Sequence, residues 1–335
     1  MDLQRTLLIG AIAALSFMLL TEWVAFKDAR IATTVQETSR IISDTDDMPS
    51  ALPEPNLDSR ASLEDDIPAA PEQTQIDAPT ETKPPAPTTI SSSRIIQIHT
   101  DVLQMAIDLD GGDIIELSLP KYLAELDNPN KPFVLLEDNE SLIYVAQSGL
   151  IGENGIDSSE RAKYTSTANR YSLTEGLDAL TVDLIWEGNG DIKITKRLNL
   201  RRGDYLVDVE YLVENNSSER WQANMFGQIK RQSGPPPLAT DNAMGMQPFL
   251  GVALTQPDDR FTKFTFEDLT EETFKAPLPG GWVAMVQHYF LSAWIPNPDQ
   301  TNTYSARVTK SGFNIAGFTS PPLVLDPGKS GNIGA

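Results

Sequence analysis

The sequence predicts one large all-β domain, a β-sandwich over residues 94–335, preceded by a membrane anchor and a tether. Three observations predict the sandwich. Short runs alternate between apolar and polar residues with a period of two, which is the periodicity of a half-buried strand. Turn sequences rich in glycine, aspartate and asparagine separate these runs. Long stretches of helical periodicity are missing from this part of the sequence, so helices are expected only as short accessories.

The first expected element is a transmembrane helix. Residues 7–20 read LLIGAIAALSFMLL and include no charged residue. A helix over residues 6–26 could cross the hydrocarbon core of a bilayer, which takes about 20 residues. A cleaved signal peptide is the alternative, but the following TEWVAFKDAR lacks a small-x-small cleavage pattern. We therefore expect residues 1–26 to form an uncleaved signal-anchor, with these anchoring side chains: Leu7, Leu8, Ile9, Leu15, Phe17, Leu19, Leu20 and Trp23.

The next segment, residues 27–93, has the composition of a disordered tether. Nine prolines lie between Pro49 and Pro87, and residues 31–93 hold twelve acidic residues against three basic ones. Few large apolar residues are present to offset the entropy lost on ordering. Like charges and proline-rich pieces both favour an extended chain, so the tether is expected to be stiffer than a Gly/Ser linker.

Residues 94–335 fit a single sandwich, because no Pro/Ser-rich gap divides them. Turn sequences occur at 110–113, 188–191 and 202–204. A further alternating run, Trp282–Trp294, places His288 in a strand. Short helices are expected near Pro120–Leu126 and Leu269–Phe274. The clearest strands are expected at Arg94–His99, Val102–Leu109, Ala179–Trp186, Asp191–Leu200 and Tyr205–Val213.

Composition excludes several classes of function. The chain has 26 basic and 47 acidic residues, a net charge of −21, which disfavours binding to a nucleic-acid backbone. It has no cysteine, so disulfides, thiolate nucleophiles and cysteine metal sites are excluded. The loop from Asp108 to Asp113 looks superficially like a calcium loop but lacks the closing glutamate, and we interpret it as a hairpin turn. No nucleotide-binding or hydrolase motif is present. We expect no catalytic residue, no metal and no cofactor, and hence a protein that is not an enzyme.

Several segments resemble the YidC membrane-protein insertases of Gram-negative bacteria. The opening MDLQRTLL resembles the start of that family. Similar segments then follow in order: TDVL at 100–103, GGD at 111–113, AQSGL at 146–150, KRL at 196–198, RGDY at 202–205 and FGQIK at 226–230. The most specific is GGWVAMVQHYF at 280–290, followed by AWIP at 293–296.

The resemblance implies that residues 94–335 form the family's periplasmic domain, a β-supersandwich related in shape to galactose mutarotases. In that family, insertion is carried out by a later bundle of five membrane helices, which we expect this chain to lack. The resemblance also implies a place in the bacterial inner membrane, with residues from about 27 onward in the periplasm. The implied partners are SecDF, the SecYEG translocon, the lipid bilayer and, through the missing bundle, nascent inner-membrane proteins; nucleic acid is not among them.

The family's periplasmic domain is associated with SecDF, and the matching stretch is residues 246–294. The residues there that we expect to bind a partner are Asp258, Asp259, Arg260, Lys263, Trp282 and Tyr289. For each aromatic member taken singly, sandwich core is the favoured interpretation. Two other functions stay open at this point. One is a glycan-binding or mutarotase-like module that uses His288 or His99 with a carboxylate, and the other is a passive spacer.

Overall fold

A computed structural model describes residues 66–68, 94–125, 128, 131–188, 191–234 and 249–335. The chain divides into two units, Met1–Ser59 and Arg60–Ala335, and every described residue belongs to the second unit. The expected anchor and most of the expected tether lie outside the described residues. Within the ranges given above, no helix is long and apolar enough to cross a membrane.

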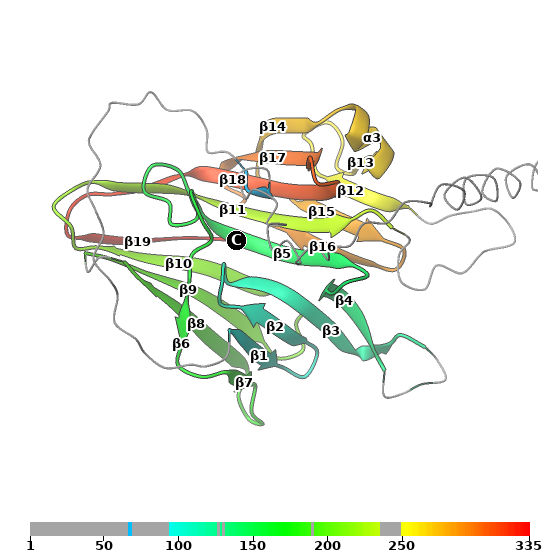
Figure 1. Cartoon of the computed structure of the whole chain (residues 1–335), viewed down its shortest axis with the longest axis horizontal. Coiled ribbons are helices and arrows are strands. Elements are labelled where there is room, and N and C mark those ends of the chain that lie inside the picture. Colours follow the sequence, from blue (N-terminus) through cyan, green and yellow to red (C-terminus); the bar gives the residue numbers. More distant parts are fainter. Residues whose placement is uncertain (1–65, 69–93, 126–127, 129–130, 189–190, 235–248) are drawn as a thin grey trace, which may run out of the picture. The chain divides into compact units, whose positions relative to one another are not determined.

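The largest element is a ten-stranded sheet (Figure 1). Its strands pair antiparallel, except for one parallel pair at the β1 edge. Their order across the sheet is β14 (Phe274–Pro279), β17 (Thr301–Val308), β18 (Phe313–Leu325), β11 (Trp221–Gln232), β5 (Ile143–Ile151), β4 (Pro132–Asp138), β3 (Asp113–Leu123), β2 (Gln104–Asp108), β1 (Ile95–His99) and β7 (Arg170–Ser172).

Two smaller sheets and a short helix complete the unit. The five-stranded sheet has the order β19 (Lys329–Gly334), β10 (Val207–Asn215), β9 (Ile192–Arg201), β8 (Ala179–Glu187) and β6 (Thr165–Ser166). The four-stranded sheet has the order β13 (Thr262–Thr265), β12 (Leu250–Leu254), β15 (Val283–Gln287) and β16 (Phe290–Trp294). Helix α3 (Phe266–Glu271) begins at a capping box formed by Thr265 and Asp268.

Both smaller sheets pack on the same face of the large sheet. The Tyr144 hydroxyl on β5 donates to Ser292 Oγ on β16 at 3.1 Å, and Ser148 on β5 shares a hydrogen bond of 3.1 Å with Tyr211 on β10. Residues four apart in a strand point to the same side, so both partner sheets lie on that side. We call it the inner face of the large sheet, and the opposite side its outer face. The predicted all-β sandwich is confirmed.

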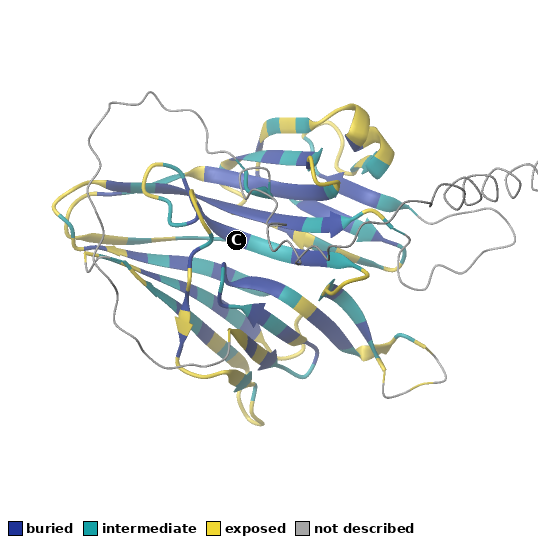
Figure 2. Cartoon of the chain, in the orientation of Figure 1, coloured by how far each residue is buried: buried dark blue, intermediate teal, exposed yellow. Residues whose placement is uncertain are grey.

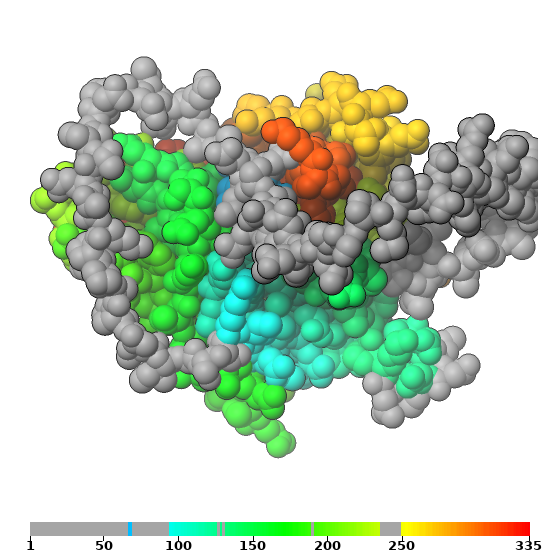
Figure 3. All heavy atoms as spheres, viewed as in Figure 1, coloured from blue at the N-terminus to red at the C-terminus, as the bar shows by residue number. Residues whose placement is uncertain are grey.

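Buried residues follow the strands, and exposed ones gather in turns and on α3 (Figure 2). Two connections project from the surface in Figure 3: the turn at residues 173–178, and the neighbouring ends of β3 and β4. Leu177, in the first of these, is an exposed large apolar residue. The packed layers therefore hold the apolar residues that the strand periodicity assigned to the core, as expected for a sandwich.

The five clearest predicted strands correspond to β1, β2, β8, β9 and β10. Tyr205 differs from the prediction, because β10 begins only at Val207 and the tyrosine side chain is exposed. The short helix expected near Pro120 is wrong, since β3 continues as a strand to Leu123. The helix expected from Leu269 begins three residues earlier, at the cap that Thr265 provides.

The prediction that His288 lies in a strand is wrong. The run Trp282–Trp294 is a hairpin, in which Gln287 on β15 pairs with Phe290 on β16 and His288 and Tyr289 form the turn. His288 has a backbone φ of +38°, a value that residues other than glycine seldom adopt. Apolar residues continue on both sides of the turn, so the sequence pattern does not reveal it.

Candidate functional site

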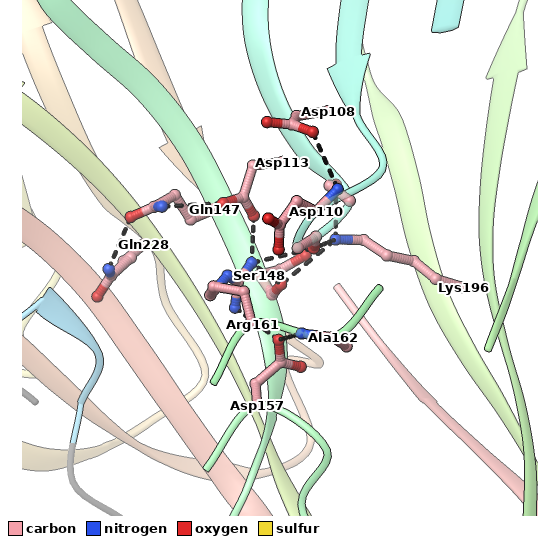
Figure 4. Close-up of polar contacts among 12 residues, drawn as sticks. Asp108, Asp110, Asp113, Gln147, Ser148, Asp157, Arg161, Ala162, Lys196 and Gln228 are labelled. Carbon is pink, nitrogen blue, oxygen red and sulfur yellow. Dashed lines mark hydrogen bonds and ion pairs between the residues drawn. The ribbon is translucent and has the colours of Figure 1, made fainter. Parts of the chain in front are cut away.

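The candidate site is a network of charged residues beside strand β5, where one edge of that strand is no longer paired with a neighbouring strand. On the β3 side, the pairing of β5 ends at Ala146, which lies opposite Ile114. Beyond it, Ser148 and Leu150 present buried backbone groups that a neighbouring strand would normally satisfy. Buried backbone groups without partners are costly, so this edge needs other donors and acceptors. Charged side chains supply them (Figure 4).

Lys196 satisfies backbone carbonyls at this edge from the inner face. It lies on β9 in a row of buried apolar residues, and its side chain is itself buried. Its ammonium group donates to the carbonyls of Gly112 at 2.8 Å, Gly111 at 3.2 Å and Ser148 at 3.3 Å. The ammonium also lies 5.5 Å from the ring centre of Tyr211, within cation–π range. A lysine in an apolar row thus links the five-stranded sheet to the large one.

Arg161 reaches the same carbonyls from the loop that follows β5. Its Nη2 donates to the carbonyls of Gly111 and Ser148, each at 3.0 Å, and to the Asp113 carboxylate. Its Nη1 donates to Asp157 Oδ1 at 2.8 Å. The side chain of Arg161 is 10% exposed and that of Asp157 is 0% exposed. The guanidinium therefore bridges two carboxylates away from water, where such pairs depend on complete hydrogen bonding.

Asp157 completes the edge by accepting hydrogen bonds that a strand would otherwise accept. Its Oδ2 accepts from the Leu150 amide at 2.9 Å, and its Oδ1 accepts from the Ala162 amide at 3.1 Å. Its own amide donates to the Leu150 carbonyl at 2.9 Å. A carboxylate with two backbone donors and an arginine has most of its lone pairs satisfied. The loop at residues 157–162 thus takes the place of a missing strand.

Glycine permits this close approach at three positions. Gly111 and Gly112 have φ values of +96° and +63°, which form the hairpin turn predicted at 110–113. A Cβ on Gly112 would lie 3.0 Å from the Lys196 nitrogen. A Cβ on Gly149 would lie 2.5 Å from Asp157 Oδ2 and 2.6 Å from a ring carbon of Phe226, distances that real contacts do not reach.

The variant Gly149→Ala is therefore expected to lower the free energy of unfolding by about 1–2 kcal/mol, because either Asp157 or Phe226 must move. Urea denaturation measures the change. Gly234→Ala is the matched control, since a Cβ there meets nothing within 4 Å, and we expect little change. Equal effects of the two variants would contradict the close packing of Asp157 on β5.

The environment shifts the pKa values of the network in opposite directions. Burial lowers the pKa of Lys196 to about 8, although the Asp113 and Asp157 carboxylates oppose the shift. Burial raises the pKa of Asp157, against the opposing charge of Arg161. For Arg161, the two carboxylates outweigh burial and raise its pKa. The arginine therefore stays charged, while the lysine is the member whose charge changes near neutral pH.

A polar chain continues from this network to the outer face of the large sheet. Gln147 Nε2 donates to Asp113 Oδ2 at 2.9 Å, and Gln228 Nε2 on β11 donates to Gln147 Oε1 at 3.0 Å (Figure 4). The same Gln228 nitrogen donates to the backbone carbonyl of Asp66 at 2.7 Å. Hydrogen bonds thus connect the buried charges to residues 66–68.

The described contacts of Lys196 are internal to the protein. Lys196 is enclosed, and the groups it contacts are protein carbonyls and rings. A separate pocket of 270 Å³ lies beside β18 and β19, and residues such as Asn297, Pro322 and Asn332 line it. Its lining includes no titratable side chain, so it offers no acid or base. The charged network joins the five-stranded sheet to the large sheet, and through Gln147 it orients the Gln228 amide on the outer face.

The residues expected to bind a partner divide between the two ends of the four-stranded sheet. Asp258, Asp259 and Arg260 form the turn between β12 and β13 and are exposed, as is Lys263 on β13. Trp282 is half-buried and its ring lies 5.8 Å from the Phe261 ring, near the same turn. Tyr289 is 76% exposed but sits at the other end of β15, about five residues or roughly 17 Å away.

The sequence contains a signal for Lys196 that the strand analysis did not use. Ile194, Leu198 and Leu200 alternate with polar residues, and this phase places Lys196 on their buried face. A lysine in the apolar phase of a strand indicates a buried cation that needs partners. Arg161 and Asp157 give no such signal, because they lie in a loop without periodicity.

The fold and its network define a class: an all-β sandwich domain of three sheets, two of which are joined by buried charged side chains. Residues 95–335 match the family described as the YidC periplasmic domain. The chain belongs to that family, and the resemblance to the YidC insertases is confirmed.

Curated relatives carry the name Membrane protein insertase YidC. One from Cellvibrio japonicus is 40% identical over 100% of this chain and 57% of its own length. Another, from Ectopseudomonas mendocina, is 38% identical over 100% of this chain and 59% of its own length. The chain therefore spans less than two thirds of the relatives that it matches.

Among solved structures, the described fold is similar to a galactose mutarotase-like protein from Lactobacillus casei. That likeness has a TM-score of 0.46 at 12% identity and covers 72% of this chain and 98% of the other. A galactose mutarotase related enzyme from Lactobacillus acidophilus gives a TM-score of 0.41 at 13% identity, over 72% of this chain and 95% of that one. Structural similarity at these TM-scores carries no information about the activity of this chain.

Proposed function

We propose that this chain is the membrane-anchored periplasmic part of a YidC-type insertase, and that it assists insertion and folding of inner-membrane proteins through protein contact rather than catalysis. Whole-chain similarity to proteins named Membrane protein insertase YidC carries the proposal. Residues 1–26 would anchor the chain in the inner membrane, 27–93 would act as a tether, and 94–335 would lie in the periplasm. Nascent membrane proteins would bind the part of the relatives that this chain does not span.

SecDF is the proposed direct partner, with SecYEG reached in the same assembly. The surface that supports this contact is the turn between β12 and β13, where exposed charges of both signs surround the half-exposed Trp282 and the exposed Phe261. Aromatic residues ringed by charged ones are typical of protein interfaces. Tyr289 would be a separate contact at the far end of the sheet.

The test is copurification of the full chain with SecDF after removal of the charges at this turn. The quadruple variant Asp258→Ala, Asp259→Ala, Arg260→Ala and Lys263→Ala is expected to reduce SecDF recovery by about ten-fold, which corresponds to about 1.4 kcal/mol of binding free energy. These side chains are exposed, so the fold should persist, and the melting temperature checks it.

The matched control removes charges from the five-stranded sheet, where Glu187, Lys193 and Glu214 are exposed. Replacing these three with alanine is expected to leave SecDF recovery unchanged. Equal recovery with both variants would contradict the proposed surface. If an unrelated fold of similar size replaced residues 94–335 without loss of insertion, the domain would instead act as a passive spacer.

A further inference from the structure

Residues 66–68 lie against the outer face of the large sheet, far in sequence from the strands that they contact (blue in Figure 1). The Asp66 carboxylate pairs with the Lys230 ammonium on β11. The Asp66 carbonyl accepts hydrogen bonds from Gln228 at 2.7 Å and from Arg307 on β17 at 3.4 Å. Ile67 and Pro68 are half-buried. Three side chains from two strands therefore converge on one short segment.

The three groups that face this segment are all hydrogen-bond donors. Lysine and arginine can only donate, and the buried network orients the Gln228 amide so that it donates as well. A carboxylate only accepts, so Asp113 requires Gln147 to present its NH2 group inward. Gln147 then offers its oxygen to Gln228, which must use its own NH2 group. The second proton of that group points to Asp66. Gln228 is 2% exposed, and the two acceptors that its NH2 group meets, Gln147 Oε1 and the Asp66 carbonyl, fix its orientation.

Lys230 is positioned by groups other than Asp66. Its nitrogen lies 4.1 Å from the ring centre of Phe313 on β18, a cation–π contact that holds it over the sheet. With Lys230, Gln228 and Arg307 present, the site is selective for a ligand that supplies only acceptors. A carboxylate next to a backbone carbonyl has that chemistry, as an acidic peptide segment does.

The fit of Asp66 itself is incomplete. Its Oδ1 is buried and has no hydrogen-bond partner among the described residues, while Oδ2 pairs with Lys230. A buried acceptor without a partner weakens the contact that contains it. The side chains of Asp66 and Lys230 are also 15% and 12% exposed, so water can reach the pair. These features suit a segment that binds and releases.

We propose that this donor cluster, Gln228, Lys230 and Arg307, is a binding site for an acidic peptide segment, and that Asp66–Pro68 occupies it as an exchangeable strap. When the strap leaves, a partner protein binds there through the carboxylate and backbone carbonyl of an acidic segment. A strap joined to the same chain is present at an effective concentration on the order of millimolar, so it blocks weak ligands but yields to tighter ones. The inference is independent of the proposed insertase function.

The test uses a fluorescent peptide of residues 62–70, SLEDDIPAA, titrated into the full chain in detergent. The variant Asp66→Ala is expected to bind this peptide about ten-fold more tightly than the wild type, because its own strap no longer competes. Adding Lys230→Met to that variant should abolish binding. Adding Lys193→Met, which removes an exposed lysine on β9, should leave binding unchanged.

A second readout follows the strap itself. The chain has no cysteine, so a spin label at Ile67→Cys reports on that position alone. The label should be immobilised in the wild-type background and mobile with Lys230→Met or Asp66→Asn. If the peptide does not bind Asp66→Ala more tightly than it binds the wild type, exchange between strap and peptide is contradicted. If the label is as immobile in Lys230→Met and Asp66→Asn as in the wild type, the role of these two residues in holding the strap is contradicted.

Discussion

Replacing Arg161 with alanine is expected to lower the free energy of unfolding by about 3–5 kcal/mol, because it leaves two buried carboxylates without their cation. Asp157 is 0% exposed and Asp113 is 9% exposed in their pairs with Arg161. The variant also removes one of the side-chain donors to each of the Gly111 and Ser148 carbonyls, at the unpaired edge of β5, and leaves Lys196 as the other. Urea denaturation of the full chain measures the loss.

A surface ion pair provides the matched control. Arg197 and Asp183 form two hydrogen bonds of 2.7 and 2.8 Å, but their side chains are 35% and 36% exposed. Arg197→Ala is therefore expected to cost only about 0–1 kcal/mol. Comparable losses in the two variants would show that the network at β5 is not a special source of stability.

The loss in Arg161→Ala should also depend on pH. Without the guanidinium, burial raises the pKa of the Asp157 carboxyl further, and protonation removes its uncompensated charge. An acid whose folded pKa is raised stabilises the folded state as pH falls. The difference from wild type should therefore shrink between pH 7 and pH 5. A constant difference would mean that lost packing, rather than charge, causes the effect.

The strands of the fold were predictable because their periodicity is local. Val207, Val209 and Tyr211 alternate with Asp208 and Glu210, and β10 forms over this segment. The turn at His288 was not predictable in this way, since apolar residues continue in the strands on both sides of this two-residue turn. Strand existence follows from pattern, whereas strand ends depend on backbone conformations that the pattern does not encode.

The charge network was only partly predictable. Lys196 could be found from its phase in β9, but its partners lie 84 and 85 residues away in the turn between β2 and β3. Arg161 and Asp157 become informative only once β5 is seen to lack a neighbour at Ser148. Asp66 pairs with Lys230 across 164 residues, and nothing in an acidic, proline-rich segment distinguishes it from its neighbours.

Stability is expected to rise with pH between about 7.5 and 10, because of Lys196. Its pKa is lowered to about 8 in the folded chain, against 10.5 for an ordinary lysine, so in this range the unfolded chain binds more protons. Stability rises with pH wherever the unfolded state holds more protons, and it levels off below the folded pKa. The contribution over this range is about 2–3 kcal/mol, from about 1.4 kcal/mol for each pKa unit.

Lys196→Met isolates this contribution. It keeps a long apolar stem in the row of Ile194 and Leu198 but has no proton to lose. The difference in unfolding free energy between wild type and variant should grow in favour of the wild type as pH rises from 7.5 to 10. Above pH 10 both chains are expected to lose stability, because burial raises the pKa values of Tyr164 and Tyr211 and ionisation of the unfolded tyrosines opposes folding. A difference that does not change below pH 10 would mean that the ammonium stays charged throughout, stabilised by the three carbonyls and two carboxylates that surround it.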